Sequence, residues 1–239
     1  MNAPLNIVPI ATTHSCFTEK FGIPRQPLLA DASRASIELL PPFNNPGAVA
    51  GLEQHSHLWL TWQFHEVAGQ WSPKVRPPRL GGNKKLGVFA TRSPFRPNNI
   101  GLSVVRLIEV RTQPGVELIV AGADLLDGTP ILDIKPYIPY ADSVPVAISD
   151  FAESAPQAAS VYIPDQIARI AQEYRDSWGT DLLALIHQVL AQDPKPAYQQ
   201  PDPERLYGME LCGFNLQWRY REDEIQVVGL SPLEQGKES

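Results

Sequence analysis

The chain has 239 residues, a formal net charge of −6 and 43% hydrophobic residues, enough for one or two globular domains with a packed core. Its apolar runs are too short to span a bilayer and its first residues lack the pattern of a secretory signal, so we expect a cytoplasmic protein. Cys16 and Cys212 are far apart and belong to no CxxC pair, which predicts buried free thiols instead of a disulfide or a zinc site. His55 and His57 share one face of an expected strand, but no HExxH motif accompanies them and we predict no metal site.

Short β-prone segments follow one another through the first 148 residues. In chain order, strands are expected at about 5–16, 36–40, 57–67, 87–91, 100–110, 116–120 and 131–137. Turns rich in Gly and Pro separate them, and no strong helical pattern occurs before about residue 160. This arrangement predicts a mainly β protein with an N-terminal β-barrel over residues 1–148.

The character of the chain changes after residue 148. A small, polar stretch at 149–160 is typical of a linker, and Pro164 then opens a helical pattern. A second helix is expected at 182–191, followed by a hairpin of strands 211–220 and 225–230 that turns at Glu222 and Asp223. We therefore predict a small C-terminal α+β domain over residues 149–239.

Residues 87–103, with the sequence GVFATRSPFRPNNIGLS, stand out from ordinary core segments. Pro94 and Pro97 stiffen the loop that carries Arg92 and Arg96, and each guanidinium offers a planar fork of donors for an anion. No Asp or Glu occurs between Glu66 and Glu109, whereas eight Lys and Arg do, so the rest of the chain carries −6 minus 8, or −14. This separation of charge favours an anionic partner over a merely solvated basic loop.

Several kinds of active site are excluded by their missing motifs. The chain has no GxGxxG after a strand, no GxxxxGK[ST] loop and no GxSxG elbow. What remains is a set of polar residues at expected strand ends: Arg25, Gln26, His65, Glu66, Arg92, Arg96, Asn98, Asp133, Lys135 and Tyr137. These residues alone predict a pocket for a polar or nucleic-acid ligand.

The sequence resembles the TsaA-like family of TrmO-type tRNA (adenine-N6)-methyltransferases. The blocks that carry the resemblance are 87–98 with 100–103, DGTP at 127–130, DIKPY at 133–137, PRQP at 24–27, SHLW at 56–59 and RPPRLGGN at 76–83. The match covers about residues 5–145, and 189–194 with 196–198 extend it into the C-terminal part. One departure is Asn99, where the family more often has Pro, and we expect it to loosen the loop slightly without removing either arginine.

The resemblance implies an S-adenosylmethionine (SAM)-dependent methyltransferase built on a non-Rossmann β-barrel and acting as a homodimer. Its substrate would be threonine tRNA, methylated on N6 of the threonylcarbamoyladenosine at position 37. The residues implied to hold the cofactor are Pro24, Arg25, Gln26, His65, Glu66, Arg92, Leu102, Asp124, Leu125, Leu126, Asp127 and Gly128. Their chemistry agrees, because a methionine carboxylate needs an arginine, adenine needs an apolar contact such as Leu102, and a ribose needs a carboxylate such as Asp127 or Glu66.

We assign catalysis to Asp133, Lys135 and Tyr137, which share one strand face by the period of two. A carbamoylated N6 is a poor nucleophile but loses its proton readily, so Lys135 or Arg92 would stabilise the anion and Tyr137 or Asp133 would receive or orient the proton. The alternative is that Asp133 and Lys135 only pair with each other. The residues expected to bind RNA are Arg76, Arg79, Lys84, Lys85, Arg96, Asn98, Lys195 and Tyr198, and we expect the C-terminal domain to help bind tRNA.

Two other functions stay open at this point. The chain could be a non-catalytic barrel that binds SAM or RNA, although a second polar cluster at the strand ends would then have no purpose. It could also transfer a methyl group to a different acceptor, because acceptor choice depends on loop shapes.

Overall fold

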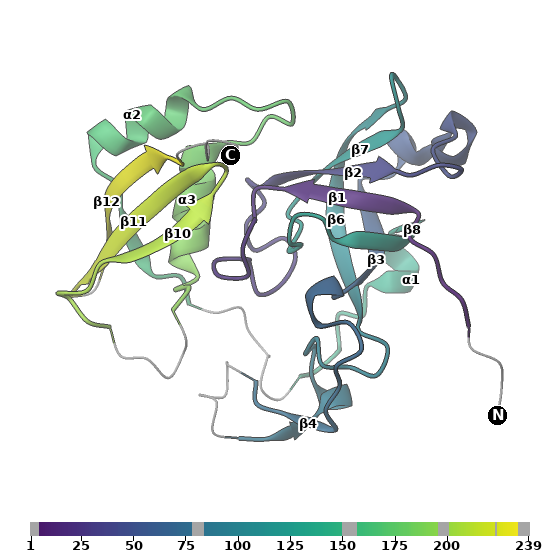
Figure 1. Cartoon of the computed structure of the whole chain (residues 1–239), viewed down its shortest axis with the longest axis horizontal. Coiled ribbons are helices and arrows are strands. Elements are labelled where there is room, and N and C mark those ends of the chain that lie inside the picture. The colour runs from purple at the N-terminus through teal and green to yellow at the C-terminus, as the bar shows by residue number, and fades with distance from the viewer. Residues whose placement is uncertain (1–4, 78–83, 150–156, 196–200, 223, 234–239) are drawn as a thin grey trace, which may run out of the picture.

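The computed structural model describes residues 5–77, 84–149, 157–195, 201–222 and 224–233. These form a β-barrel from the first part of the chain and a helix-covered sheet from the last part, set side by side (Figure 1). Arg79 and Tyr198, two of the predicted RNA contacts, lie outside the described residues.

Six antiparallel strands close the barrel, as the sequence predicts. They are β1 (Ala11–Ser15), β2 (Arg34–Leu39), β3 (His57–Gln63), β6 (Ile100–Arg111), β7 (Glu117–Ala121) and β8 (Pro130–Pro136). Their order around the barrel is β1-β2-β7-β6-β3-β8, and β8 pairs with β1 to close it. Because β3 pairs antiparallel with both β6 and β8, the end of β3 lies beside the beginnings of β6 and β8.

The alternation of β3 explains how the barrel is filled. Leu58, Leu60 and Trp62 point inward and are buried, whereas the residues between them are partly exposed. Gly101 on β6 lies directly opposite Trp62, and a Cβ at that position would collide with the indole ring. Gly101 is therefore needed so that the indole fits against the barrel wall.

Short elements connect the barrel strands. They are the 3-10 helices η1 (Pro46–Val49), η2 (Leu52–Gln54), η3 (His65–Val67) and η5 (Val88–Ala90), the two-stranded ribbon of β4 (Lys74–Val75) and β5 (Leu86–Gly87), and the helix α1 (Pro139–Asp142). The strand expected at 87–91 is thus mostly a 3-10 turn, in which the Thr91 amide donates to the Val88 carbonyl. The β-like first run is also shorter than expected and begins only at Ala11.

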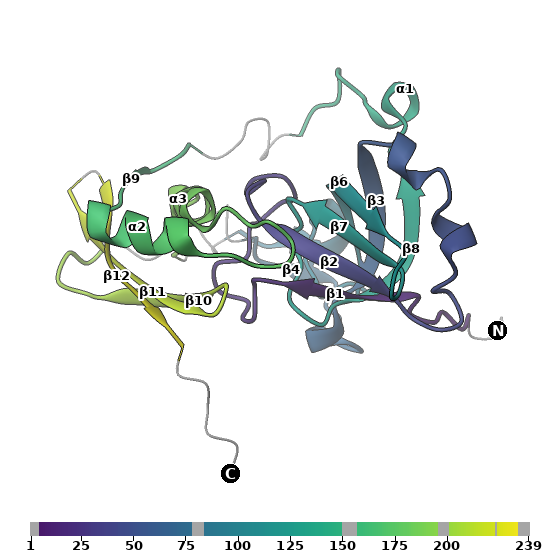
Figure 2. The same ribbon diagram turned by 90° about the horizontal axis from the view of Figure 1, so that it is seen from above.

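The C-terminal part is a small α+β domain, as predicted. Its sheet has the order β10-β11-β12-β9 and is formed by β9 (Ser160–Tyr162), β10 (Tyr207–Leu211), β11 (Phe214–Arg221) and β12 (Glu224–Pro232). The helices α2 (Asp165–Glu173) and α3 (Leu182–Ala191) cover one face of this sheet (Figure 2). Strands β9 and β10 were not predicted, because a three-residue strand paired in parallel carries too little pattern and β10 follows a long loop. Within the described ranges, no helix is long and apolar enough to cross a membrane.

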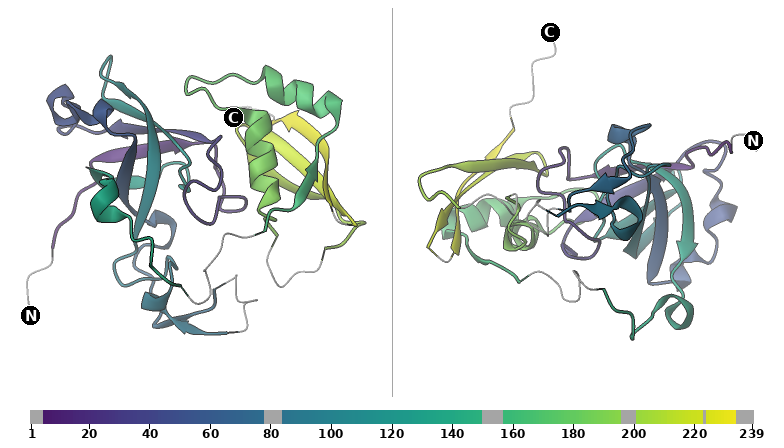
Figure 3. Two further views of the ribbon diagram at one scale, coloured as in Figure 1. Left: turned by 180° about the vertical axis from the view of Figure 1, so that it is seen from behind. Right: turned by 90° about the horizontal axis from the view of Figure 1, so that it is seen from below.

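The two parts share a hydrophobic core. Phe17, Ala30 and Ala32, which come from the segment between β1 and β2, are buried together with side chains of α3 and of the C-terminal sheet. In the view from behind, this segment reaches from the barrel to the C-terminal domain (Figure 3). The boundary drawn along the sequence therefore does not coincide with a boundary between hydrophobic cores.

The prediction of two free thiols is wrong. Cys16 and Cys212 form a disulfide with a Cα–Cα distance of 4.3 Å, although 196 residues separate them. Cys212 sits in the tight turn between β10 and β11, and its amide donates to the Cys16 carbonyl. The fold brings both cysteines together at the junction of the barrel and the C-terminal domain, which sequence spacing could not reveal.

Candidate active site

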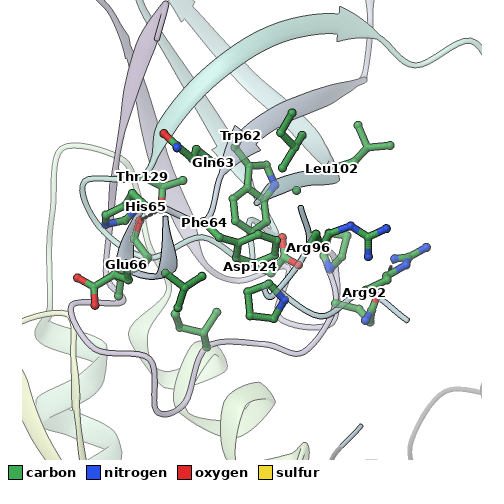
Figure 4. Close-up of a pocket in the computed structure, with 18 of the residues that line it drawn as sticks. Trp62, Gln63, Phe64, His65, Glu66, Arg92, Arg96, Leu102, Asp124 and Thr129 are labelled. Carbon is green, nitrogen blue, oxygen red and sulfur yellow. Dashed lines mark hydrogen bonds between the residues drawn. The ribbon is translucent and has the colours of Figure 1, made fainter. Parts of the chain in front are cut away.

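A cavity of about 760 Å³ opens at the end of the barrel where β3 ends and β6 begins. This volume lies within the usual range for a small-molecule or cofactor site. Its lining combines aromatic rings, two carboxylates and three arginines, and Figure 4 labels Arg92 and Arg96 among them. The arrangement suits a ligand that has both a flat apolar part and charged groups.

A hydrogen-bonded row of side chains forms the inner wall of the cavity. The Trp62 indole Nε1 donates to the Ser103 hydroxyl at 3.0 Å, and the hydroxyl donates to Asp124 Oδ1 at 2.6 Å. Trp62 and Ser103 are buried, and Phe64 packs edge-on against Trp62 with ring centroids 4.2 Å apart. The row fixes one oxygen of Asp124 and leaves the carboxylate at the cavity surface.

Burial raises the pKa of Asp124 to about 6. The hydrogen bond from Ser103, the residue's own backbone amide and the positive charge of Arg92 each oppose this rise but do not cancel it. Asp124 can therefore bind a positively charged ligand or accept a proton.

A second wall connects the cavity to the C-terminal domain. Arg92 Nη1 donates to the side-chain oxygen of Gln26 at 2.5 Å. The neighbouring Arg25 points the other way, and its Nη2 donates to the carbonyls of Asp193 at 3.4 Å and Lys195 at 3.2 Å. Arg25 therefore anchors the Gln26 segment to the C-terminal domain, and Arg92 remains oriented at the cavity.

Asn99 joins two loops of the cavity. Its side-chain oxygen accepts from the Gly69 amide at 2.9 Å, and its amide nitrogen donates to the carbonyls of Gln70 at 2.8 Å and Pro94 at 2.9 Å. The residue is 3% exposed and has a left-handed backbone with φ of 49°. The expectation that Asn99 loosens this loop is wrong, because the side chain ties the loop to its neighbour.

The cavity gathers most of the residues predicted to hold the cofactor. Those that line it are Pro24, Arg25, Gln26, His65, Glu66, Arg92, Leu102, Asp124 and Leu126. Leu125, Asp127 and Gly128 are not among the lining residues. Leu125 is fully buried in the barrel core, while Asp127 accepts from the Ser15 amide and the Gly128 amide donates to Thr13, so both shape the turn before β8.

The predicted catalytic residues lie on the outer face of the barrel, beside the cavity. Asp133 and Lys135 form an ion pair with each other, and their side chains are 47% and 69% exposed. Tyr137 packs against Trp59 with ring centroids 5.8 Å apart, and Trp59 is part of the cavity lining. The three residues thus share one face, as expected, but none of them lines the cavity.

The predicted RNA-binding residues differ in their surroundings. Arg76, Lys84 and Lys85 are exposed near the β4–β5 ribbon, which projects away from the barrel (Figure 1), and Asn98 is exposed as well. The guanidinium of Arg96, by contrast, donates to the Thr91 carbonyl at 2.7 Å and braces its own loop. Lys195 is buried, with its ammonium 2.5 Å from Asp193, and this geometry opposes the phosphate contact predicted for it.

The sequence analysis missed the aromatic and hydroxyl side chains of the cavity. Trp59, Trp62 and Phe64 line it, and Ser103 orients Asp124. The residues of β3 looked like ordinary strand residues, since aromatic side chains are common in sheets. The one usable signal was that β3 ends on the polar pair His65 and Glu66, which does line the cavity.

Comparison with known proteins agrees with the geometry. Residues 12–143 match the tRNA-methyltransferase O N-terminal domain family, and residues 156–233 match the TrmO C-terminal domain family. The chain is 51% identical over 231 residues to a Pseudomonas aeruginosa protein named "Putative S-adenosylmethionine-dependent methyltransferase RcsF", covering 95% of this chain and 97% of that one. It is 42% identical over 231 residues to the Escherichia coli tRNA (adenine(37)-N6)-methyltransferase, covering 93% and 96% of the two chains.

Solved structures give the same result. The crystal structure of TrmO from Pseudomonas aeruginosa superimposes with a TM-score of 0.81 at 43% sequence identity, covering 96% of this chain and 99% of that chain. Since the similarity extends over both the barrel and the C-terminal domain, the chain belongs to the tRNA-methyltransferase O family.

Proposed function

We propose that this protein is a SAM-dependent tRNA (adenine(37)-N6)-methyltransferase. The observation that carries the proposal is the cavity at the end of β3 and the start of β6, which brings Arg92, Asp124 and Glu66 together around an aromatic wall. Relatives that match nearly the whole chain are named as SAM-dependent or tRNA (adenine(37)-N6)-methyltransferases, which supports the same reaction.

The residues of the cavity fit the three chemical parts of SAM. Arg92 offers a guanidinium to a carboxylate, while Asp124 and Glu66 offer negative charge to an ammonium, a sulfonium or a ribose. Trp62, Phe64 and Leu102 provide the apolar surface that a purine needs. When bound, SAM supplies an electrophilic methyl group on its sulfonium.

The work of the protein is mainly positioning. The Trp62–Ser103–Asp124 row fixes a carboxylate, and the Arg92–Gln26 contact fixes a guanidinium across the cavity. Groups held in this way align the methyl donor with an attacking nitrogen without further reorganisation.

We further propose that the acceptor is N6 of threonylcarbamoyladenosine in threonine tRNA. A carbamoylated N6 gives up its proton more readily than an ordinary adenine amine, so a nearby cation can stabilise the anion that attacks. Tyr137 packs against Trp59, which lines the cavity, and Lys135 lies opposite Trp59 on the neighbouring strand. These two residues are therefore our candidates for contact with the modified base. Their catalytic roles remain predictions.

The tRNA backbone would be bound by the exposed basic residues Arg76, Lys84 and Lys85 near the β4–β5 ribbon. Binding through phosphates predicts that the affinity for tRNA falls steeply with added salt. A tRNA substrate also agrees with the cytoplasmic location expected from the sequence. We propose a homodimer too, supported by the 44% exposed Ile108 on β6, which a second copy would cover.

The proposal is tested by a methyl-transfer assay with labelled SAM and two preparations of threonine tRNA, one with the threonylcarbamoyl group and one without it. Label in the modified tRNA alone is the expected result. Label in both would keep the tRNA methyltransferase but remove the claim about the modified base. No label in either, with SAM still bound, would indicate a non-catalytic SAM-binding protein or a different acceptor.

A further inference from the structure

Two loops on different sides of the cavity supply its charged residues. Residues 64–70 carry His65 and Glu66, and residues 91–96 carry Arg92 and Arg96. Figure 4 shows Glu66 and Arg92 on opposite sides of the cavity. Each loop is short and lies outside the barrel strands, so the distance between these charges depends on what connects the loops.

Asn99 makes that connection with both ends of its side-chain amide. Its side chain accepts from Gly69 and donates to Gln70 in one loop, and it donates to Pro94 in the other. Its backbone does the same, because the Asn99 carbonyl accepts from the Phe64 amide at 2.8 Å and its amide donates to Arg96 at 3.1 Å. An amide side chain has two donor hydrogens and an acceptor oxygen, and here both hydrogens and the oxygen are engaged.

The backbone of Asn99 also limits which residues fit. A φ of 49° lies in the left-handed region, where Gly and Asn are tolerated and Pro, fixed near −65°, is not. Of the residues that tolerate this conformation readily, glycine cannot make the three side-chain bonds. Backbone and side chain therefore both favour asparagine at this position.

We propose that Asn99 is a positioning residue of the methyl-transfer site, which sets the spacing between Glu66 and Arg92 by joining residues 64–70 to residues 91–96. It does not line the cavity, so it acts through the two loops. The inference rests on the proposed function, since SAM is the ligand whose charged groups this spacing would serve.

The test is Asn99→Gly, which tolerates the left-handed backbone and removes only the three side-chain bonds. Loss of these part-buried bonds leaves two carbonyls and one amide without their protein partner and releases the two loops from each other, so we expect SAM affinity measured by calorimetry to fall about tenfold. The KM for SAM should rise by a similar factor, with a smaller change in kcat at saturating SAM. Hydrogen exchange at the Gly69 amide should become faster in the same variant.

The matched control is Asn45→Gly. The side-chain oxygen of Asn45 also accepts a hydrogen bond from a backbone amide, that of Gly47. Asn45, however, lines a different cavity at the far end of the barrel core. This variant should lose stability without losing SAM affinity. If Asn99→Gly fails to fold, Asn99→Asp keeps the acceptor and lacks both donors, and it too must bind SAM more weakly.

Unchanged SAM affinity in a folded Asn99 variant would overturn the proposal, as would an equal loss of affinity in Asn45→Gly. Failure of the proposed function would give results that differ from failure of the positioning role. Wild-type protein that binds SAM but methylates no tRNA would refute the reaction, while the effect of Asn99 on SAM affinity would still decide the positioning role. Wild-type protein that does not bind SAM would refute both.

Discussion

Replacement of Asp124 by Asn should make the ligand-free protein more stable at neutral pH. The pKa of Asp124 is about 6 in the folded protein against an ordinary value of 3.8, because burial disfavours the charged form. The folded state therefore binds more protons than the unfolded state between these values, and stability falls as the pH rises from 3.8 to about 6. The difference corresponds to about 3 kcal/mol of cost at pH 7, at 1.36 kcal/mol for each pKa unit.

Asn at this position keeps the oxygen that accepts from Ser103 and removes the charge. In urea unfolding at pH 7.5, we expect Asp124→Asn to exceed wild type by up to about 3 kcal/mol, and this difference should disappear near pH 4. The same variant should bind SAM more weakly, because a positively charged ligand loses its carboxylate.

Ser103→Ala provides an independent check of the reasoning. The hydrogen bond from Ser103 lowers the pKa of Asp124, so its removal should move the pH window of destabilisation upward. Equal stability of Asp124→Asn and wild type at pH 7.5, or a difference that does not change with pH, would refute the account of a buried charged carboxylate.

Three further variants test other parts of the structure. Lys135→Ala removes an exposed ion pair with Asp133, so the free energy of unfolding should change by less than about 1 kcal/mol. Turnover at saturating tRNA should fall about tenfold or more if Lys135 stabilises the anionic base. Unchanged turnover would mean that Lys135 forms only a surface ion pair. Arg25→Ala should both weaken SAM binding and lower the melting temperature, because Arg25 anchors the Gln26 segment to the C-terminal domain. An effect on tRNA binding alone would contradict this anchoring role. Cys212→Ser should lower the free energy of unfolding by about 2–4 kcal/mol under oxidising conditions. A reductant should lower the melting temperature of wild type but not of the variant. Equal sensitivity of the two proteins to the reductant would argue against a structural disulfide.

Local pattern was sufficient to predict most of the barrel. The alternation in β3 and the apolar run of β6 reflect one buried face and one exposed face, which a period of two reveals directly. The helices α2 and α3 were equally readable, since Asp181 caps α3 and apolar residues recur at helical spacing. Strand β9 could not be read, because its three residues gain their role only from pairing with β12.

Long-range contacts decided where sequence reasoning about the site failed. Arg92 and Glu66 were assigned to the site from their motifs, and both line the cavity. Lys195 looked like a free cation, but the turn after α3 pairs it with Asp193. Asn99 looked like a defect in a proline-rich loop, because its partners lie some 30 residues away or across the loop and cannot be seen in the local sequence.

The packing of Phe17, Ala30 and Ala32 into the core of the C-terminal domain has a practical consequence for dissecting the molecule. A fragment cut after residue 148 would expose these side chains to water and would also lose the carbonyls that hold Arg25. Poor binding of tRNA or SAM by such a fragment would therefore report damage to the barrel as much as the missing domain. Substitutions on the face of the C-terminal sheet that α2 and α3 leave open are the cleaner way to ask what that domain contributes, because they leave the common core intact.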